Sequence, residues 1–207
     1  MKIGIVTIYN VPNYGAILQA YSLAEYLRRE GHEVVLFNVD SPKIHPYIYK
    51  LKRLFKLGFI DKFQQRNYPA ITSNLNEEVD IYMVGSDQVW NIEITQADYD
   101  KYFLAFALHN RKVSYAASFG NNEWDFPSKR NEIRGFLSAF KYITVREEMG
   151  VNILKDEFNM KGNCVLDPCF LLDGNDFLFG KIIESKKILV SYKLSYDRFY
   201  DLELRKL

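Results

Sequence analysis

The chain of 207 residues has 48% hydrophobic residues, 26% charged residues and a formal net charge of +1, the composition of an ordinary globular protein and not of a nucleic-acid binder, which usually carries a marked basic excess. It contains no apolar run long enough to span a bilayer, and residues 1–7 are too short for a signal peptide, so we expect a cytoplasmic protein. Its two cysteines are too few for a disulfide framework and its three histidines are scattered, so the sequence predicts no metal site.

The first elements of the chain predict a β-α-β unit. Residues 2–7 form an apolar strand, residues 16–30 repeat apolar side chains at helical spacing, and residues 33–39 form a second strand. Gly31 stands where helices favour glycine as a stop. Because such crossovers are right-handed and join parallel strands, we expect the loop of residues 8–15 at the carboxyl end of the first strand.

This loop contains the first candidate ligand-binding residues, Asn13, Tyr14 and Gly15. They lie at the predicted N-terminus of a helix, where free backbone N–H groups and a partial positive charge attract anions. The loop is not a dinucleotide-binding fingerprint, because it has one glycine where three are needed. The alternative interpretation is structural: Asn13 caps the helix and Gly15 allows tight packing.

Residues 43–66 carry seven lysines and arginines, offset by Asp61 alone, with apolar residues interleaved between them. The pattern indicates one or two amphipathic helices. A basic amphipathic helix can lie on a membrane surface, which predicts peripheral membrane contact through this segment. A helical insert with a solvated charged face explains the same pattern and is the interpretation that we favour.

Residues 80–91 form the stretch around which the other motifs are arranged. The apolar run 81–84 is typical of a buried strand, and it breaks abruptly into a glycine followed by a hydroxyl, a carboxylate and an amide. In open parallel sheets, ligands bind at this position, beyond the carboxyl ends of the strands. A polar turn in which Trp90 fills the core is the alternative interpretation. The candidate ligand-binding residues of this stretch are Gly85, Ser86, Asp87, Gln88, Trp90 and Asn91.

Two later strands each end in a further candidate residue. Residues 113–117 lead to Ser118, whose hydroxyl is expected at the same edge of the sheet. Residues 142–145 lead to Arg146, and a guanidinium at a sheet edge can bind phosphate or carboxylate through paired hydrogen bonds. Both side chains are therefore candidate ligand contacts, and for Arg146 a purely structural role is the alternative.

The other elements of this region are expected to be structural. Helices are predicted over residues 127–140 and up to about residue 158, and a strand is predicted over residues 164–166. Thr144 and Glu147 have the spacing of a capping box, which would explain Glu147 without any functional role.

The order of these elements predicts an α/β fold, with a Rossmann-like parallel sheet of about six strands and helices on both faces over residues 1–172. Residues 173–186 are typical of a surface linker. Residues 187–192 form an apolar strand and residues 196–207 a charged helix. We therefore expect residues 187–207 to open a second α/β domain that is truncated in this chain.

Five motifs occur in the same order as in the polysaccharide pyruvyl transferase family, which the chain resembles. They are Asn-Tyr-Gly-Ala at 13–16, Gly-Ser-Asp-Gln-Val-Trp-Asn at 85–91, Tyr-Ala-Ala-Ser-Phe-Gly at 115–120, Val-Arg-Glu-Glu at 145–148 and Asp-Pro at 167–168. The resemblance implies two Rossmann-like domains that face each other across a cleft, as in many glycosyltransferases. This chain resembles the first of them.

The activity that the resemblance implies is transfer of pyruvate from phosphoenolpyruvate to a sugar of a cell-surface polysaccharide precursor, with no cofactor. The chemistry needs a base for the attacking hydroxyl, and Asp87 is the candidate. Sugar binding is expected from Asn13, Tyr14, Ser86, Gln88, Trp90 and Asn91. By analogy with two-domain transferases, the donor would bind mainly in the second domain, so we predict that this chain alone is inactive.

The partners implied are phosphoenolpyruvate and a sugar or lipid-linked oligosaccharide acceptor, met in the cytoplasm or at the inner face of the membrane. A second copy of the chain is left open as a partner. Two other functions also stay open: a nucleotide-sugar glycosyltransferase, which would release a nucleotide, and a non-catalytic module that binds a glycan or a protein partner.

Overall fold

The structure is a computed structural model that describes residues 1–11, 13–39, 60–107 and 111–177. The chain divides into two units, Met1–Asp173 and Gly174–Leu207. Of the second unit the structure describes a 3-10 turn, η4 (Gly174–Phe177). The predicted strand and helix within residues 187–207 lie outside the described residues, as do residues 43–59 of the predicted basic segment.

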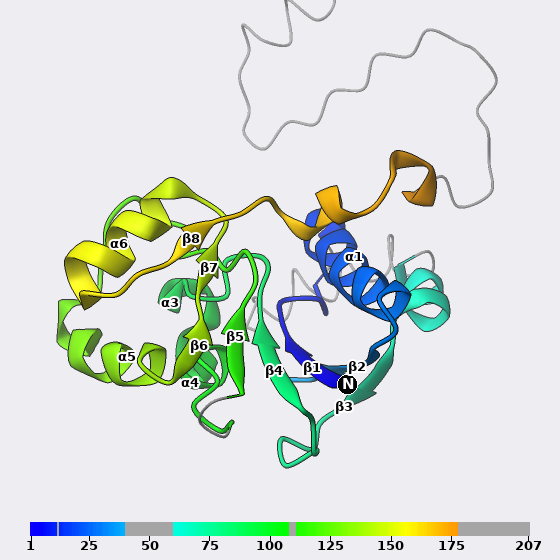
Figure 1. Cartoon of the computed structure of the whole chain (residues 1–207), viewed down its shortest axis with the longest axis horizontal. Helices are drawn as coiled ribbons and strands as arrows, with labels where there is room; N and C mark the ends of the chain where they lie inside the picture. Colours follow the sequence, from blue (N-terminus) through cyan, green and yellow to red (C-terminus); the bar gives the residue numbers. More distant parts are fainter. Residues whose placement is uncertain (12, 40–59, 108–110, 178–207) are drawn as a thin grey trace, which may run out of the picture. The chain divides into compact units, whose positions relative to one another are not determined.

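Six parallel strands form the central sheet of the first unit (Figure 1). Their order, β3-β2-β1-β4-β5-β6, is that of a doubly wound sheet. The chain winds from β1 toward one edge of the sheet and from β4 toward the other, so the winding reverses between β1 and β4. This arrangement confirms the predicted Rossmann-like α/β fold. The strands are β1 (Lys2–Val6), β2 (Glu33–Phe37), β3 (Ala70–Thr72), β4 (Ile81–Val84), β5 (Lys112–Ser114) and β6 (Phe140–Tyr142).

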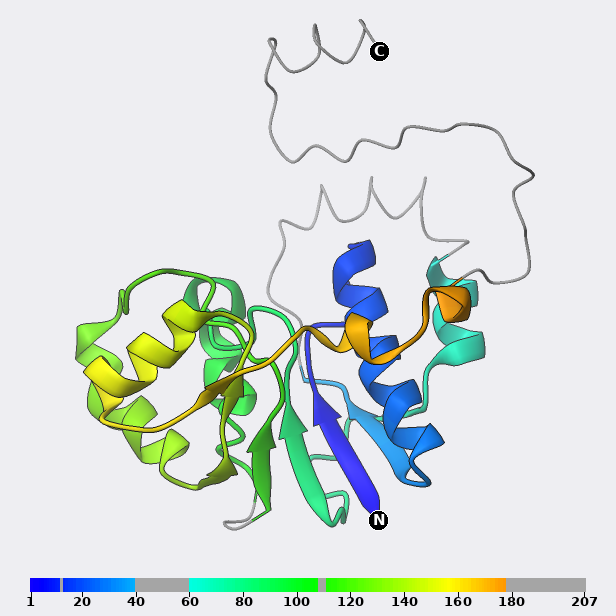
Figure 2. The same ribbon diagram turned by 45° about the horizontal axis from the view of Figure 1, so that its top comes forward.

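Helices cover both faces of this sheet (Figures 1 and 2). On one face, α1 (Tyr14–Arg29) joins β1 to β2, and the helical residues 60–67 lie beside it, with the rings of Phe63 and Tyr21 5.4 Å apart. The elements of the other face are α3 (Ile92–Thr95), η1 (Gln96–Asp98), α4 (Tyr99–Tyr102), η2 (Pro127–Lys129) and α5 (Arg130–Leu137).

The last part of the first unit builds a second, smaller sheet. β7 (Thr144–Val145) pairs in parallel with β8 (Asn163–Cys164), and α6 (Glu148–Phe158) connects them. The chain then crosses back to α1, against which the 3-10 helix η3 (Pro168–Leu171) packs (Figure 1). This crossing carries residues 165–167 over the carboxyl ends of the strands.

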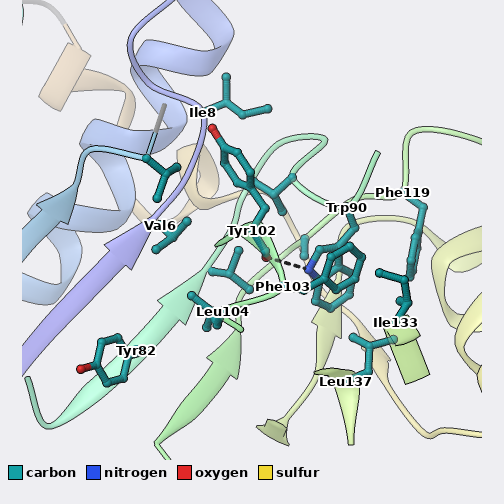
Figure 3. Close-up of a cluster of buried hydrophobic side chains, with 14 of the residues drawn as sticks. Val6, Ile8, Tyr82, Trp90, Tyr102, Phe103, Leu104, Phe119, Ile133 and Leu137 are labelled. Carbon is teal, nitrogen blue, oxygen red and sulfur yellow. Dashed lines mark hydrogen bonds between the residues drawn. The ribbon is translucent and has the colours of Figure 1, made fainter. Parts of the chain in front are cut away.

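An aromatic cluster fills the core on the face of α3 to α5 (Figure 3). Trp90 has no exposed surface, stacks on Phe103 with ring centroids 5.6 Å apart, and donates its indole N–H to the carbonyl of Tyr102 at 3.2 Å. Gly4 of β1 leaves the space that Phe37 fills, because a Cβ at residue 4 would lie 2.3 Å from the Phe37 ring. The core therefore depends on close packing of aromatic rings, including the ring of Phe37 against the backbone of β1 at Gly4.

Three predicted strands differ from the structure. The strand expected over residues 164–166 is observed as β8, which already ends at Cys164. The strand expected over residues 142–145 is divided between β6 of the large sheet and β7 of the small one. The strand expected over residues 113–117 ends at Ser114, because Ala116 has a φ of 50° and donates its N–H to the Thr144 hydroxyl at 3.1 Å instead of to a strand. The elements β3, α3 and α4 were not predicted, since three or four residues are too few to show a periodic pattern.

The predicted capping box is wrong. The hydroxyl of Thr144 donates to the carbonyl of Ser114 at 2.7 Å and does not cap a helix. The helix α6 begins at Glu148, and Glu147 at its N-cap position makes no capping hydrogen bond with its side chain. The carboxylate of Glu147 instead accepts from Nε of Arg146 at 2.8 Å. The bond partners of Thr144 come from β5, a neighbour that local sequence spacing does not show.

Candidate functional site

Backbone hydrogen bonds join the loops at the carboxyl ends of the strands into one layer. Ser118 after β5 donates its N–H to the carbonyl of Asp87 after β4, at 3.0 Å, and accepts in return from the N–H of Trp90, at 3.1 Å. The N–H of Arg146 after β7 reaches the carbonyl of Ala117 at 3.0 Å. Three loops that are far apart in the sequence are therefore held in a fixed relation to each other.

The turn after β4 brings Asp87 into this layer in an unusual backbone conformation. Gly85 has a φ of 114°, and a Cβ on it would lie 2.2 Å from the carbonyl oxygen of Tyr115, so a side chain has no room there. The next peptide bond, to Ser86, is cis, and Asp87 has a φ of 73°. Left-handed conformations of residues other than glycine are sparsely populated and cluster at functional sites.

A bridge of buried polar groups, the Gln19 bridge, lies beneath this turn. Gln19 of α1 is 2% exposed, and its Nε2 donates to the hydroxyl of Thr7 at 2.9 Å and to the carbonyl of Ile8 at 3.1 Å. Its Oε1 accepts from the N–H of Ser86 at 3.1 Å, and the Thr7 hydroxyl donates to the Ser86 carbonyl at 3.0 Å. The bridge fastens α1 to the ends of β1 and β4, where the winding of the sheet reverses.

Four charged side chains gather above the Gln19 bridge and form what we name the ionic cluster: Asp87, Arg146, Glu147 and Asp167. Arg146 donates from Nε to Glu147 at 2.8 Å and from Nη1 to Oδ2 of Asp167 at 3.3 Å. The same Oδ2 accepts from the hydroxyl of Ser86 at 2.8 Å. Asp87 accepts from the N–H of its neighbour, residue 88, at 2.8 Å. Three carboxyl groups thus face a single guanidinium in this part of the described structure.

The environment of Asp87 raises the pKa of its carboxyl above the ordinary value. Burial is the main cause, because it disfavours the charged form. The N–H of Gln88 and the charge of Arg146 act in the opposite direction, while the nearby charges of Asp167 and Glu147 add to the increase. A raised pKa makes a carboxylate at a sheet edge a stronger proton acceptor than an ordinary aspartate.

The pKa of Asp167 is shifted in the opposite direction. Burial by itself raises the pKa of this carboxyl, but hydrogen bonds from the N–H of Cys169, the hydroxyl of Ser86 and Arg146 together lower it below the ordinary value. The ionised form is therefore favoured at Asp167 and disfavoured at Asp87. Two neighbouring carboxyl groups whose pKa values are pushed apart are the pattern of an acid–base site.

The loop before α1 lies at the same edge. Asn13 caps the helix, with its side-chain oxygen accepting from the N–H groups of Gly15 at 2.9 Å and Ala16 at 3.4 Å. This is the structural role that the sequence offered as an alternative to ligand contact. Tyr14 is 51% exposed, so its ring presents a surface to solvent at the start of α1.

Gln88, Asn91 and Ser118 form a small polar network. Asn91 is 7% exposed, caps α3 by accepting from the N–H of Glu93 at 3.0 Å, and donates to the side chain of Gln88 at 3.0 Å. The hydroxyl of Ser118, itself buried, accepts from the N–H of Gly120 at 3.0 Å. A Cβ on Gly120 would lie 2.4 Å from the Gln88 side chain. Gln88 is half-buried and has the most accessible side chain of these three predicted residues.

Trp90 lies in the core, as the alternative interpretation of its motif had it. A fully buried indole that is enclosed by Phe103, Phe119 and Phe140 offers no face on which a sugar could stack. Ser86 has no exposed surface either. These two residues, with Gly85, shape the turn that carries Asp87.

Four residues of the site were not predicted as functional: Thr7, Gln19, Glu147 and Asp167. Gln19 occupies a position in the apolar face of an amphipathic helix, and a glutamine among apolar residues is a signal that the sequence does contain. Asp167 follows a predicted strand, as Asp87 does, and the rule that ligands bind at carboxyl ends of strands applies to it equally. The ion pairs of Glu147 and Asp167 with Arg146 depend on the tertiary fold.

A cavity of about 680 Å³ lies at the opposite, amino-terminal edge of the sheet, beside Lys2, Asp80 and Arg111. Both of its cationic side chains are already engaged, Lys2 with Glu77 at 2.8 Å and Arg111 with the carbonyl of Val79 at 3.1 Å. The candidate site is therefore the ionic cluster, where a strained backbone, opposed pKa shifts and the winding reversal coincide.

In the part of the chain that the structure describes, no group of three or more His, Cys, Asp or Glu side chains is placed to hold a metal ion. Nor does any helix among the described residues combine the length and the apolar character needed to cross a membrane.

Residues 13–207 match the family model described as "Polysaccharide pyruvyl transferase", which covers most of the chain and includes all five motifs. No curated protein matches the chain.

Proposed function

The chain belongs to the polysaccharide pyruvyl transferase family, and we propose that it binds the acceptor sugar and supplies the base for transfer of pyruvate from phosphoenolpyruvate to that sugar. The observation that carries the proposal is Asp87, a partly buried carboxyl group with a raised pKa. The Gln19 bridge and the loops after β4 and β5 fix its position.

The reaction requires a proton acceptor next to a sugar hydroxyl. As the hydroxyl oxygen bonds to C2 of the enolpyruvyl group, its proton moves to Asp87, while C3 takes a proton from a general acid and becomes a methyl group. A second hydroxyl then displaces phosphate from C2 and closes the ketal, and its proton leaves with the inorganic phosphate. The proton on Asp87 replaces the one given to C3. General base catalysis of this kind is worth about 10²–10⁴ in rate, and it is most effective when the pKa of the base lies near the working pH.

The charge of the ionic cluster favours a neutral sugar over the donor. Three carboxyl groups, Asp87, Glu147 and Asp167, surround Arg146. Phosphoenolpyruvate carries a phosphate and a carboxylate, and like charges at close range disfavour its binding here. We therefore propose that the donor is held mainly by a second domain, whereas the hydroxyl groups of a sugar bind beside Asp87.

Accessible polar groups at this edge are suited to hold a sugar ring. Tyr14 is exposed at the start of α1, and Asn13, Gln88 and Arg146 each retain accessible surface. Aromatic rings and amides are common partners of polar ligands of this kind. The acceptor would be a sugar or a lipid-linked oligosaccharide, and a cytoplasmic enzyme would meet it in solution or at the inner face of the membrane.

The proposal can be tested in the source cells, on the product of the native gene. Replacing Asp87 by asparagine in the native gene keeps the size and the hydrogen-bond acceptor of the side chain but removes the base. We expect pyruvate ketals on the cell-surface glycan, measured by mass spectrometry, to fall at least about 100-fold. The control is Asp156→Asn, an exposed position on α6 that should leave the ketals unchanged.

Two outcomes would contradict the proposal. Unchanged ketals in the Asp87→Asn strain would remove Asp87 from the chemistry. Release of a nucleotide from a nucleotide sugar by the purified protein, in place of phosphate from phosphoenolpyruvate, would support the glycosyltransferase alternative.

A further inference from the structure

We propose that Asp167 is a positioning residue, which holds Arg146 away from Asp87 and so leaves Asp87 without an ion-pair partner. The proposal rests on the role of Asp87 given above. It gives the crossing between β8 and η3 a part in the acid–base chemistry, although Asp167 need not touch the sugar.

The guanidinium of Arg146 is hydrogen-bonded to two carboxylates other than Asp87. Its Nε donates to Glu147 at 2.8 Å and its Nη1 to Oδ2 of Asp167 at 3.3 Å. Both ion pairs are with carboxylates other than Asp87, and within the described residues Arg146 forms none with Asp87. The carboxyl of Asp87 instead accepts from the N–H of Gln88 at 2.8 Å. A guanidinium close enough to act on Asp87 through its charge is thus bonded to two other carboxylates.

Hydrogen bonds hold the carboxylate of Asp167 in a fixed position. Its Oδ1 accepts from the N–H of Cys169 at 3.0 Å, and its Oδ2 accepts from the Ser86 hydroxyl at 2.8 Å. Ser86 is fully buried and belongs to the Gln19 bridge through its own N–H and carbonyl. Asp167 is therefore fixed to the end of β4 on one side and to η3 on the other, and Arg146 is held by a rigid partner.

The charges around Asp87 act on its carboxyl in opposite directions. Arg146 and Glu147 follow β7, Asp167 follows β8, and Tyr115 after β5 lies beside Asp167. Arg146 favours the ionised form of Asp87, whereas Asp167 and Glu147 oppose it. Without the charge of Asp167, the guanidinium would be free to pair with Asp87, and one repulsive charge would be lost as well. Both changes favour ionised Asp87, which would weaken it as a base near neutral pH.

The test measures the Asp87 carboxyl directly by ¹³C NMR titration of the full chain, with the signal assigned by its loss in Asp87→Asn. In Asp167→Asn, which removes the charge but keeps one of the two side-chain oxygens that accept from Ser86 and Cys169, we expect the titration midpoint of Asp87 to move to lower pH. An amide-proton spectrum like that of the wild type verifies the fold. A midpoint that stays in place or moves to higher pH overturns the proposal.

A double-mutant cycle distinguishes an effect of Asp167 that acts through Arg146 from direct charge repulsion between Asp167 and Asp87. In an Arg146→Gln background, Asp167→Asn is expected to move the midpoint by less than half as much as in the wild type. An equal shift in both backgrounds shows that Arg146 is not the intermediary and overturns the positioning role. Glu147→Gln is the matched control, and its shift is expected to be smaller because Glu147 is more exposed than Asp167.

The readout does not depend on pyruvate transfer. If the Asp87 midpoint shifts as expected while Asp87→Asn cells keep their pyruvate ketals, the proposed function fails and the positioning role of Asp167 stands. If the ketals are lost but the midpoint does not respond to Asp167→Asn, the proposed function stands and the positioning role fails.

Discussion

Asp87 combines three features that are individually unfavourable: a left-handed backbone, partial burial and two carboxylate neighbours. Each one makes the folded protein less stable than it would be with a residue suited to the place. Functional groups are commonly held in this way, with surrounding contacts enforcing the strained conformation. At this site the enforcing contacts are the bonds from Ser118 and Val89 to the Asp87 carbonyl, at 3.0 Å and 2.8 Å.

The raised pKa of Asp87 gives a prediction about stability at the residue scale. Its ordinary pKa is 3.8, and the folded value is higher, so ionisation as the pH rises through the folded pKa lowers the stability of the folded state. Asp87→Asn removes this ionisation. We expect the variant to have a higher melting temperature than the wild type at pH 7, with the difference disappearing below about pH 3.8.

Thermal unfolding followed by circular dichroism across this pH range tests the prediction. Asp156→Asn, whose side chain is exposed, should follow the wild type at every pH. A lower melting temperature for Asp87→Asn at pH 7 would mean that the ionised carboxylate stabilises the fold, contrary to the burial seen here.

At the scale of elements, the close approach of β4 and β5 depends on Gly85. A Cβ there would lie 2.2 Å from a backbone oxygen of Tyr115, which cannot move without shifting β5. We expect Gly85→Ala to lower the free energy of unfolding by at least about 2 kcal/mol, from overpacking together with its φ of 114°.

The matched control is Gly135→Ala in α5, where a new Cβ meets nothing within 4 Å. Removing a glycine from an exposed helix interior should raise stability by about 0.5–1 kcal/mol. Urea denaturation of both variants measures the free energy of unfolding. An equal loss of stability at the two positions would show that the lack of space around Gly85 is not the cause.

The long elements could be predicted from the sequence because their patterns are local. Apolar runs and helical spacing predicted β1, α1, β2, β4 and α6 close to their observed bounds. The division of residues 142–145 between two sheets could not be predicted, since it depends on hydrogen bonds between Thr144 and Ser114 across 30 positions. The site follows the same rule: motif residues marked the loops, whereas the ion pairs of Arg146 required the fold.

At the scale of the whole molecule, charge is distributed unevenly. The chain has a net charge of +1, yet the ionic cluster sets three carboxyl groups against Arg146. Composition alone therefore gave no indication of an acidic site. The basic excess of residues 43–66 offsets it in the total, in a part of the sequence that lies mostly outside the described structure.

This uneven charge supports the prediction that the 207-residue chain alone is inactive. We expect no inorganic phosphate to be released when the purified chain is mixed with phosphoenolpyruvate and a panel of neutral sugars. Binding of the acceptor sugar, followed by NMR shifts of the Gln88 and Tyr14 signals, should still be measurable. Release of phosphate in proportion to the amount of chain would show that it holds the donor after all.

The Gln19 bridge has a consequence for the way in which mutational data on this protein should be interpreted. Apolar core positions tolerate exchange among similar side chains, but no apolar residue can satisfy the polar atoms that Gln19 serves. In a deep mutational scan scored by activity, positions 7, 19 and 86 would be as intolerant as position 87. They would then be mistaken for catalytic residues although their bonds hold the turn that carries Asp87. A parallel scan of protein abundance separates the two classes. Abundance should fall for substitutions at the three bridge positions and remain high for substitutions at Asp87.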